Sequence, residues 1–279
     1  MDYTLSNLVL STITVEAKIS NINFKEKELI HLLSLDEKSD IIKIGCNFNE
    51  YISDKYIELT KPIKKSNRGR KKKIKQVSSR KVQGNGKYFN SQITFTILDD
   101  IDKNKFYHLK LFTNGTIQIP FVCNENIQII KPIIEIIIDK INKFQNIKIN
   151  NDENIEIVYI KSIMRNYKFN IIEDKLFIDL YKFQNILINY KNIQNTTNIF
   201  QLYPLELTLI KFFPERYTGI ILKFKTPILN NIDKLTTLKI FSSGKINIDG
   251  SNSLDESNKI KNIIHSLIEQ NKEIILYYK

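Results

Sequence analysis

Two stretches of the chain alternate a phenylalanine with lysines, amides and hydroxyls: LKLFTNGTIQI at residues 109–119 and LKIFSSGKINI at residues 238–248. Side chains alternate between the two faces of a β-strand, so Leu109 belongs to one face while Lys110 and Phe112 share the other. Lysine and amide groups can donate hydrogen bonds to acceptors on base edges, and an apolar ring can enter a base step. These residues therefore offer the chemistry of nucleic-acid binding rather than that of catalysis.

The same alternation assigns a polar face to each hairpin and to the strand before the first one. In ITFTI at residues 93–97, apolar side chains alternate with threonines. The predicted polar face comprises Gln92, Thr94, Thr96, Lys110, Phe112, Thr116 and Gln118 in the first part of the chain, and Lys239, Phe241, Lys245 and Asn247 in the second. The alternative interpretation for both phenylalanines is ordinary aromatic packing.

One segment carries nearly all of the excess positive charge. The net charge is +12, and residues 61–81 hold 11 Lys or Arg with no Asp or Glu, so the rest of the chain is almost neutral. A dense positive run suits a polyanion such as nucleic acid or an anionic membrane. The candidate nucleic-acid contacts in this segment are Arg68, Arg70, Lys71, Lys72 and Lys73. The alternatives are a solvated loop and a nuclear targeting signal.

The residue types that usually carry catalysis or hold metals are sparse and scattered. The spacing of the histidines and cysteines fits neither a metal site nor a disulfide framework; they are His31, His108, His265, Cys46 and Cys123. The sequence shows no nucleotide-binding loop and no nucleophile motif. We therefore predict a non-enzymatic protein without metal or cofactor, with reduced thiols in an intracellular setting.

The sequence also lacks a stretch with the length and apolar character of a membrane span. The longest apolar stretch, residues 127–141, is interrupted by Lys131, Glu135 and Asp139. The first residues do not have the pattern of a signal peptide. We therefore expect no membrane partner.

The chain contains an internal repeat. An offset of 129 residues aligns the two hairpins and the strands before them, without a gap from residue 87 to residue 119. The matched pairs include Tyr88 with Tyr217, Phe95 with Phe224 and Leu109 with Leu238. A fixed register over this span predicts two copies of one unit, residues 1–147 with the basic insertion near 61–81, and residues 148–279.

Each copy has the same expected order of elements: strand, helix, antiparallel strands with a tight hairpin, and a closing helix. The first strands are expected at 11–19 and within 155–169. The expected helical stripes are Phe24, Leu29, Leu32 and Leu33; Leu176, Leu180, Phe183 and Leu187; and Ile260, Ile263, Ile264, Leu267 and Ile268. Pro132 is expected near the start of the helix at 126–144, or as a kink in it, and Ser253 with Glu256 forms a capping-box pattern.

Such units predict an α+β fold in which the two copies join edge to edge into one curved antiparallel sheet. The helices shelter one face of this sheet, so the other face stays open to bind something large. We expect a monomer with an internal pseudo-two-fold axis.

The hairpin sequences LKIFSSGKINIDGSNS and LKLFTNGTIQIP resemble the hairpin of the TATA-box-binding protein (TBP) family, and FPERYTGIILKFKTP at 213–227 resembles its second strand. The basic run followed by QGNGKYFNSQITF looks like the branch found in giant DNA viruses. The resemblance implies a saddle whose concave sheet binds and bends DNA through the minor groove, a mechanism of which this family is itself the standard example. The implied contacts are the wedges Phe112 with Tyr88 (or its rival Phe89) and Phe241 with Tyr217, together with Lys223.

The resemblance further implies double-stranded, A·T-rich promoter DNA as the ligand, and a general transcription initiation factor and RNA polymerase as partners. The expected compartment is the nucleus, or a cytoplasmic viral factory or virion. At the position where the family uses an asparagine to read the centre of the site, this chain has Leu8, and Lys110 and Lys239 replace usually aliphatic residues. These departures predict a weaker TATA preference and a steeper salt dependence.

Two alternatives stay open at this point. The same sheet would also suit an architectural module or one that binds single strands or RNA, because aromatic platforms stack free bases. A third possibility is an interaction scaffold in which the basic segment alone binds the nucleic acid.

Overall fold

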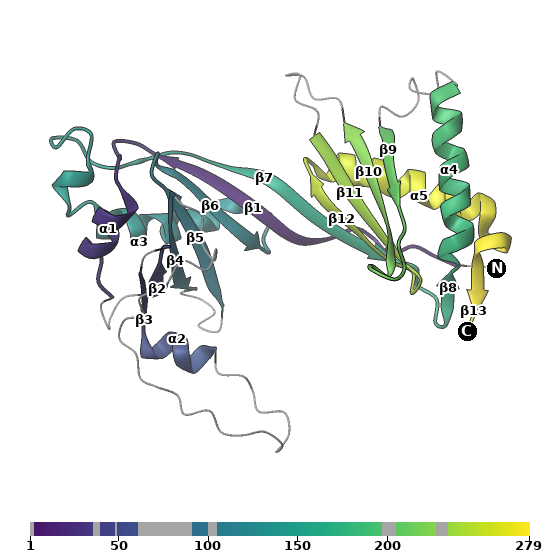
Figure 1. The fold of residues 1–279 in the computed structure, drawn as a ribbon, viewed down its shortest axis with the longest axis horizontal. Helices are drawn as coiled ribbons and strands as arrows, with labels where there is room; N and C mark the ends of the chain where they lie inside the picture. The colour runs from purple at the N-terminus through teal and green to yellow at the C-terminus, as the bar shows by residue number, and fades with distance from the viewer. Residues whose placement is uncertain are drawn as a thin grey trace, which may run out of the picture. The chain divides into compact units, whose positions relative to one another are not determined.

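The computed structural model describes residues 3–35, 40–47, 49–60, 91–99, 105–196, 205–226 and 234–279 (Figure 1). Its fold is α+β, as predicted, and eleven of the described strands belong to one large antiparallel sheet. The chain divides into an N-terminal unit, residues 14–122 and 126–162, and a C-terminal unit, residues 1–13, 123–125 and 163–279. Strands β1 (Val9–Ile19) and β7 (Ile157–Asn170) contribute residues to both units.

In the C-terminal unit the strand order is β7, β12 (Lys245–Ser251), β11 (Lys234–Phe241), β10 (Gly219–Thr226) and β9 (Glu206–Lys211). Helices α4 (Leu180–Thr196) and α5 (Leu254–Ile275) belong to this unit, and α5 passes behind β10–β12 in Figure 1. Strand β8 (Leu176–Ile178) pairs with β13 (Leu276–Tyr278) in a separate small sheet. The first residues of the chain also pack on the core of this unit, through Tyr3, Leu5, Leu8 and Leu10.

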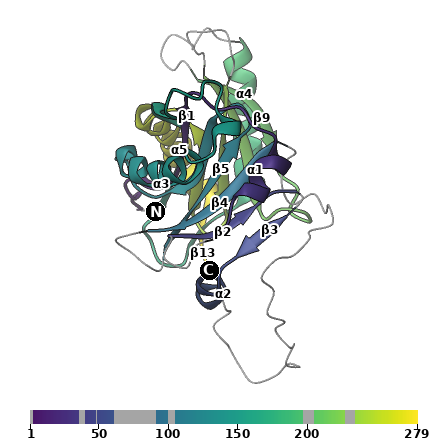
Figure 2. The same cartoon turned by 90° about the vertical axis from the view of Figure 1, so that its left-hand side faces the viewer.

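In the N-terminal unit the order is β3 (Glu50–Ile52), β2 (Ile41–Gly45), β4 (Gln92–Leu98), β5 (Phe106–Phe112), β6 (Thr116–Val122) and β1. Its helices are α1 (Glu26–Leu32), α2 (Asp54–Leu59) and α3 (Lys131–Ile141), with 3-10 turns η1 (Ile127–Ile130) and η2 (Gln145–Ile147). Figure 2 shows α2 apart from α1 and α3 and near β3. The predicted apolar set Ile93, Phe95 and Ile97 is fully buried.

Both predicted hairpins turn on a glycine in the left-handed region. Gly115 has φ 80° and Gly244 has φ 76°, and each donates its N–H to the carbonyl of the preceding phenylalanine, Phe112 or Phe241. An added Cβ at Gly115 would lie 2.7 Å from the carbonyl oxygen of Ile19. Backbone conformation and space therefore both require glycine at the first turn.

Two details of the expected helices are wrong. Leu176 lies in strand β8, and α4 begins only at Leu180, because the chain between them pairs with β13. Leu32 is on α1 but 38% exposed, whereas Leu29 is buried. Pro132 lies in the first turn of α3, where the missing N–H is tolerated, so the expected placement near the helix start is confirmed.

The gapless alignment of the two repeats is also wrong in one place. In the N-terminal unit Phe95 pairs with Leu109, but in the C-terminal unit Leu238 pairs with Leu222 and not with Phe224. Relative to the offset of 129 residues, the pairing of β10 with β11 is therefore shifted by two residues from the pairing of β4 with β5. By strand pairing, Gly219 corresponds to Gln92, an offset of 127 residues rather than 129.

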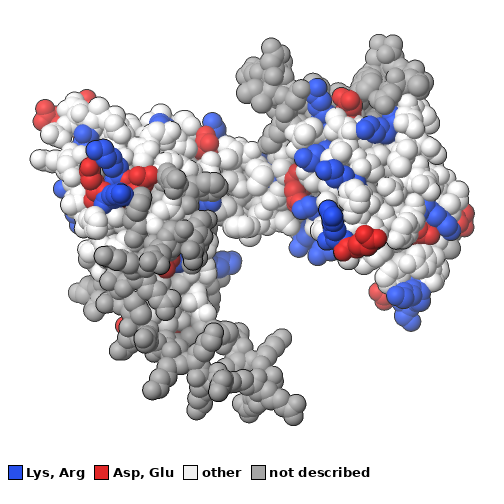
Figure 3. All heavy atoms as spheres, in the orientation of Figure 1, with Lys and Arg blue, Asp and Glu red and all other residues white. Residues whose placement is uncertain are grey.

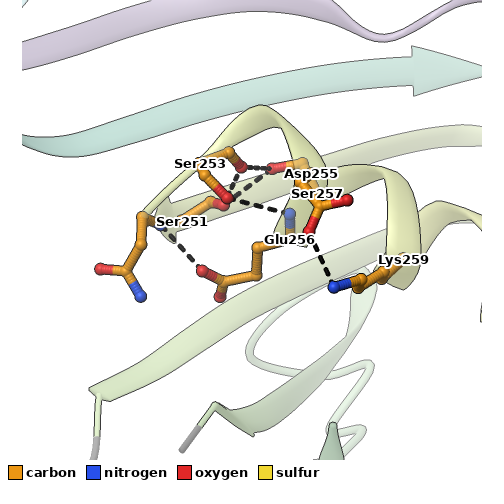
Figure 4. A network of polar contacts seen from close by, with 7 residues as sticks. Ser251, Ser253, Asp255, Glu256, Ser257 and Lys259 are labelled. Atoms are coloured by element: carbon orange, nitrogen blue, oxygen red, sulfur yellow. Dashed lines mark hydrogen bonds and ion pairs between the residues drawn. The ribbon is translucent and has the colours of Figure 1, made fainter. Parts of the chain in front are cut away.

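The N-terminus of α5 is fixed by a buried polar network (Figure 4). Ser253 Oγ accepts a hydrogen bond from the Glu256 N–H at 3.0 Å, as the capping-box pattern predicted. The Glu256 carboxylate accepts from the Asn252 N–H at 3.0 Å and from the hydroxyl of Thr236 in β11. Glu256 is 5% exposed and Thr236 is fully buried, so this carboxylate joins the helix start to the sheet.

Glu256→Ala is expected to destabilise the C-terminal unit by about 2–3 kcal/mol, because it removes a helix-cap contact and leaves the buried Thr236 hydroxyl without its acceptor. Chemical denaturation would measure the change. The control is Asp255→Asn, one residue earlier, whose exposed ion pair with Lys259 spans 2.7 Å and should contribute less than about 1 kcal/mol. Equal losses in both variants would contradict the role of the buried network.

Candidate nucleic-acid interface

The C-terminal unit has a polar sheet face built from β7 and β9 to β12. Cross-strand pairing places Lys223 opposite Thr237, Lys239 opposite Asn247, and Asn247 opposite Lys168. Ile220, Leu222, Leu238 and Ile240 alternate with these residues and are fully buried. Figure 3 shows several Lys and Arg side chains on the exposed surface over these strands. The predicted alternation of a buried apolar face with a polar face is therefore present.

An aromatic pair lies at one end of this face. The ring centroids of Tyr217 and Phe241 are 5.8 Å apart with an interplanar angle of 58°, and both side chains are half-buried. Gly219 is directly opposite Phe241, and an added Cβ there would lie 3.1 Å from the Phe241 ring and 2.9 Å from the Ile240 carbonyl oxygen. The absence of a side chain at Gly219 therefore makes room for the ring of Phe241.

The lysines on this face differ in their surroundings. Lys239 Nζ lies 2.7 Å from Asp249 Oδ2, and this hydrogen bond raises the pKa of Lys239, so the lysine stays cationic at neutral pH. The same pairing offsets part of its charge. Lys245 is exposed and Lys223 is half-buried. Asn247, between Lys239 and Lys168 in the pairing, is half-buried as well.

A hollow of about 250 Å³ opens on the same unit, lined by Ser6, Val9, Lys168, Phe169, Asn170 and Lys245. Lys168 and Lys245 provide cationic groups, and Asn170 and Ser6 provide polar ones. Sequence reasoning missed Lys168, although its alternation with the buried Tyr167 and Phe169 could have assigned it to the polar face.

In the N-terminal unit the predicted residues of β4 to β6 are neighbours. Thr94 pairs with Lys110, and Lys110 pairs with Gln118, while Phe112 lies opposite Gln92. Phe112 and Thr116 are half-buried. Neither Phe112 nor Phe241 is among the buried core residues, so neither ring is enclosed in the core of its unit.

Two members of the predicted open face are buried instead. Gln92 is 2% exposed and Thr96 is 1% exposed, so the expectation that they reach solvent is wrong. Gln92 donates from Nε2 to Thr94 Oγ1 at 3.1 Å and has the Phe112 side chain as its cross-strand neighbour. Thr96 Oγ1 lies 3.2 Å from His108 Nδ1 on the adjacent strand.

The burial of Thr96 reflects a covered region at the far end of the same face. Lys43 and Glu50 form an ion pair of 2.5 Å that is largely buried, and Lys43 Nζ lies 5.1 Å from the centroid of the Tyr56 ring of α2. The pKa of His108 is lowered, mainly because the ring is partly buried and secondly because Lys43 and Lys110 are positively charged. Strands β2 and β3 thus extend the sheet beyond β4, and α2 packs through Tyr56 on Lys43 and Phe106, on a face that the sequence predicted to be open.

Several predicted contacts lie outside the described residues: Tyr88, Phe89, Arg68, Arg70, Lys71, Lys72 and Lys73. Among the residues that the structure describes, no group of His, Cys, Asp and Glu is suited to hold a metal ion. Within the same residues, no helix combines the length and apolar character needed to cross a membrane.

The fold and this surface define a class: an α+β protein whose large antiparallel sheet presents one hairpin phenylalanine per unit on a polar face. The family model described as "Transcription factor TFIID (or TATA-binding protein, TBP)" matches residues 181–271. These residues run from the start of α4 through most of α5 and include the whole aromatic pair.

Curated relatives extend the similarity to nearly the whole chain. "Putative TATA-binding protein pB263R" of African swine fever virus, isolate Tick/South Africa/Pretoriuskop Pr4/1996, is 29% identical over 275 residues, covering 98% of this chain and 92% of the relative. The protein of isolate Pig/Kenya/KEN-50/1950 has the same identity and coverage. A solved structure, "Methanococcus jannaschii TBP", aligns over 95% of this chain and 99% of its own with 13% identity and a TM-score of 0.43. The family and relative matches support a viral TBP-like protein, which confirms the predicted resemblance.

Proposed function

We propose that this protein is a TBP-like transcription initiation factor that binds double-stranded DNA through the minor groove and bends it. The observation that carries the proposal is the Tyr217–Phe241 pair, half-buried on a lysine-bearing sheet face beside a glycine that makes room for it. Phe112 holds the equivalent hairpin position in the N-terminal unit. The likeness to proteins named as TATA-binding supports the same function.

The chemistry of the face suits the minor groove. At A·T pairs this groove presents only the acceptors adenine N3 and thymine O2, which lysines and the amides of Asn247 and Gln118 can satisfy as donors. Phe112 and Phe241 would act as wedges that partly unstack a base step. The cost is a few kcal/mol per step, as known for this family, and the larger contact surface of bent DNA offsets it.

The remaining parts of the proposal follow the family. Residues 1–147 and 148–279 would be two copies of one ancestral unit, each binding half of the DNA site, and the equivalent turn glycines Gly115 and Gly244 support the duplication. The partners would be a general transcription initiation factor and RNA polymerase. The basic segment at 61–81 would contact phosphates.

A competition experiment tests the ligand class. The full-length protein is expected to prefer an A·T-rich duplex to a single strand of the same sequence and to double-stranded RNA, because the face offers groove donors and wedges rather than a platform for free bases. Circular-permutation gel shift is expected to report a bend in the bound duplex. Preference for the single strand, or tight binding without a bend, would favour the alternative of a single-strand or RNA-binding module.

A further inference from the structure

The two hairpin phenylalanines have different cross-strand neighbours. Gly219 lies opposite Phe241, whereas Gln92 lies opposite Phe112. The equivalent position therefore carries no side chain in the C-terminal unit and a carboxamide in the N-terminal unit. If both rings enter DNA, the base step entered by Phe112 lies beside a carboxamide, and the step entered by Phe241 does not.

The Gln92 carboxamide is fixed in a specific orientation. Its side chain is buried, and its Nε2 donates to Thr94 Oγ1 at 3.1 Å, while Gln92 Oε1 has no hydrogen-bond partner in the described structure. A buried acceptor without a donor is unfavourable, so a ligand that brings a donor to this oxygen gains more than it would at a hydrated site. The geometry thus provides an acceptor beside the wedge, while one of the two N–H donors of the same amide is already used by Thr94.

The minor groove contains one kind of base donor. A·T pairs show only acceptors there, and the 2-amino group of guanine is the single donor that a G·C pair adds. We propose that Gln92 Oε1 accepts a hydrogen bond from a guanine 2-amino group at the base step entered by Phe112. This inference rests on the proposed minor-groove function and deepens it, because it makes Gln92 a specificity-determining residue.

The wedge movement itself supplies access to this acceptor. Directly opposed side chains of an antiparallel pair are close neighbours, and Gln92 is buried in the free protein opposite Phe112. When that ring enters a base step, it leaves this position, and the edge of the adjacent base pair can reach the carboxamide. Gly219 offers no side-chain acceptor, so the preference for guanine is confined to the half-site bound by the N-terminal unit, which gives the site a direction.

Base analogues isolate the 2-amino group from every other feature of the pair. Hypoxanthine is guanine without this group, and 2,6-diaminopurine is adenine with it. A scan of the bound site with full-length protein is expected to find one half in which guanine→hypoxanthine weakens binding about 3- to 10-fold, the range of one hydrogen bond to a buried group. Adenine→2,6-diaminopurine at the same pair is expected to strengthen binding by a similar factor.

Variants assign the effect to the side chain. Gln92→Leu keeps the approximate size and should remove the difference between guanine and hypoxanthine, while Gln92→Glu keeps acceptor oxygens and should retain it. Gln118→Leu removes another amide from the same face and should leave the difference intact. Thermal unfolding of each variant checks that it is folded, and the analogue scan on the unaltered protein needs no variant.

The outcomes separate this inference from the proposed function. Failure to bind any duplex would overturn the proposed function. Duplex binding with bending, but with equal affinity for guanine and hypoxanthine at every position, would overturn the inference alone. A difference that persists in Gln92→Leu would likewise overturn the role of Gln92.

Discussion

Replacing both Phe112 and Phe241 by alanine is expected to weaken binding to an A·T-rich duplex by about 100-fold or more and to abolish bending. Each ring would lose contacts with stacked bases worth about 1–3 kcal/mol, and without wedges the duplex has no reason to unstack. Gel shift gives the affinity, and circular permutation gives the bend. Both rings are half-buried, so the protein should remain folded.

A control phenylalanine is available in the same unit as Phe112. Phe121, at the end of β6, is 71% exposed and lies outside the predicted polar face. Phe121→Ala should therefore leave bending unchanged. Undiminished binding and bending in the double variant would exclude the wedge mechanism, and an equal loss in Phe121→Ala would show that the effect is not specific to the paired hairpins.

Affinity for DNA is expected to fall steeply with salt, by roughly 10³-fold or more between 50 and 200 mM, if the protein neutralises six or more phosphates. Deleting residues 64–75 removes much of the basic segment and should reduce both the affinity and the slope of log K against log salt concentration. A site-dependent remainder should persist, because the sheet face keeps Lys223, Lys239 and Lys245. Fluorescence anisotropy over a salt series would measure both quantities.

Single lysine variants serve as the matched comparison for this deletion. Lys168→Gln and Lys245→Gln, both beside the hollow of the C-terminal unit, should each lower the slope by about 1 if their ammonium groups meet phosphates. Complete loss of nucleic-acid binding on deletion of residues 64–75 would instead support the scaffold alternative.

The strand faces and the hairpins could be predicted because each depends on local chemistry. Alternation with a period of two placed Leu238 and Ile240 on the face that packs in the core, and Lys239 and Phe241 on the opposite face. A glycine three residues after each phenylalanine predicted the tight turn, since only a residue that tolerates positive φ fits there. The helix cap at Ser253 could also be predicted, because it bonds a backbone N–H only three residues later.

The features that sequence did not reveal depend on contacts between distant segments. The burial of Thr96 and the Lys43–Glu50 ion pair arise from β2, β3 and α2, which have no counterpart in the repeat pattern. The shift of β10 against β11 is two residues, so every side chain keeps its face and the alternation of either strand does not reveal it. The position of Gln92 opposite Phe112 depends on the register between β4 and β5, which the sequence alone does not give.

The packing of residues 3–13 on the C-terminal unit has a consequence for biosynthesis. These residues are translated before the rest of the C-terminal unit, yet Ser6 donates its N–H to Asn170, Thr4 accepts from the Ile172 N–H, and the Ser6 carbonyl accepts from Lys261 Nζ. Their partners are translated more than 160 positions later. The C-terminal unit therefore cannot finish folding as an autonomous module, because it must pair with a segment that was synthesised much earlier. A protein divided near residue 147 would yield a C-terminal fragment that lacks residues packed on its own core.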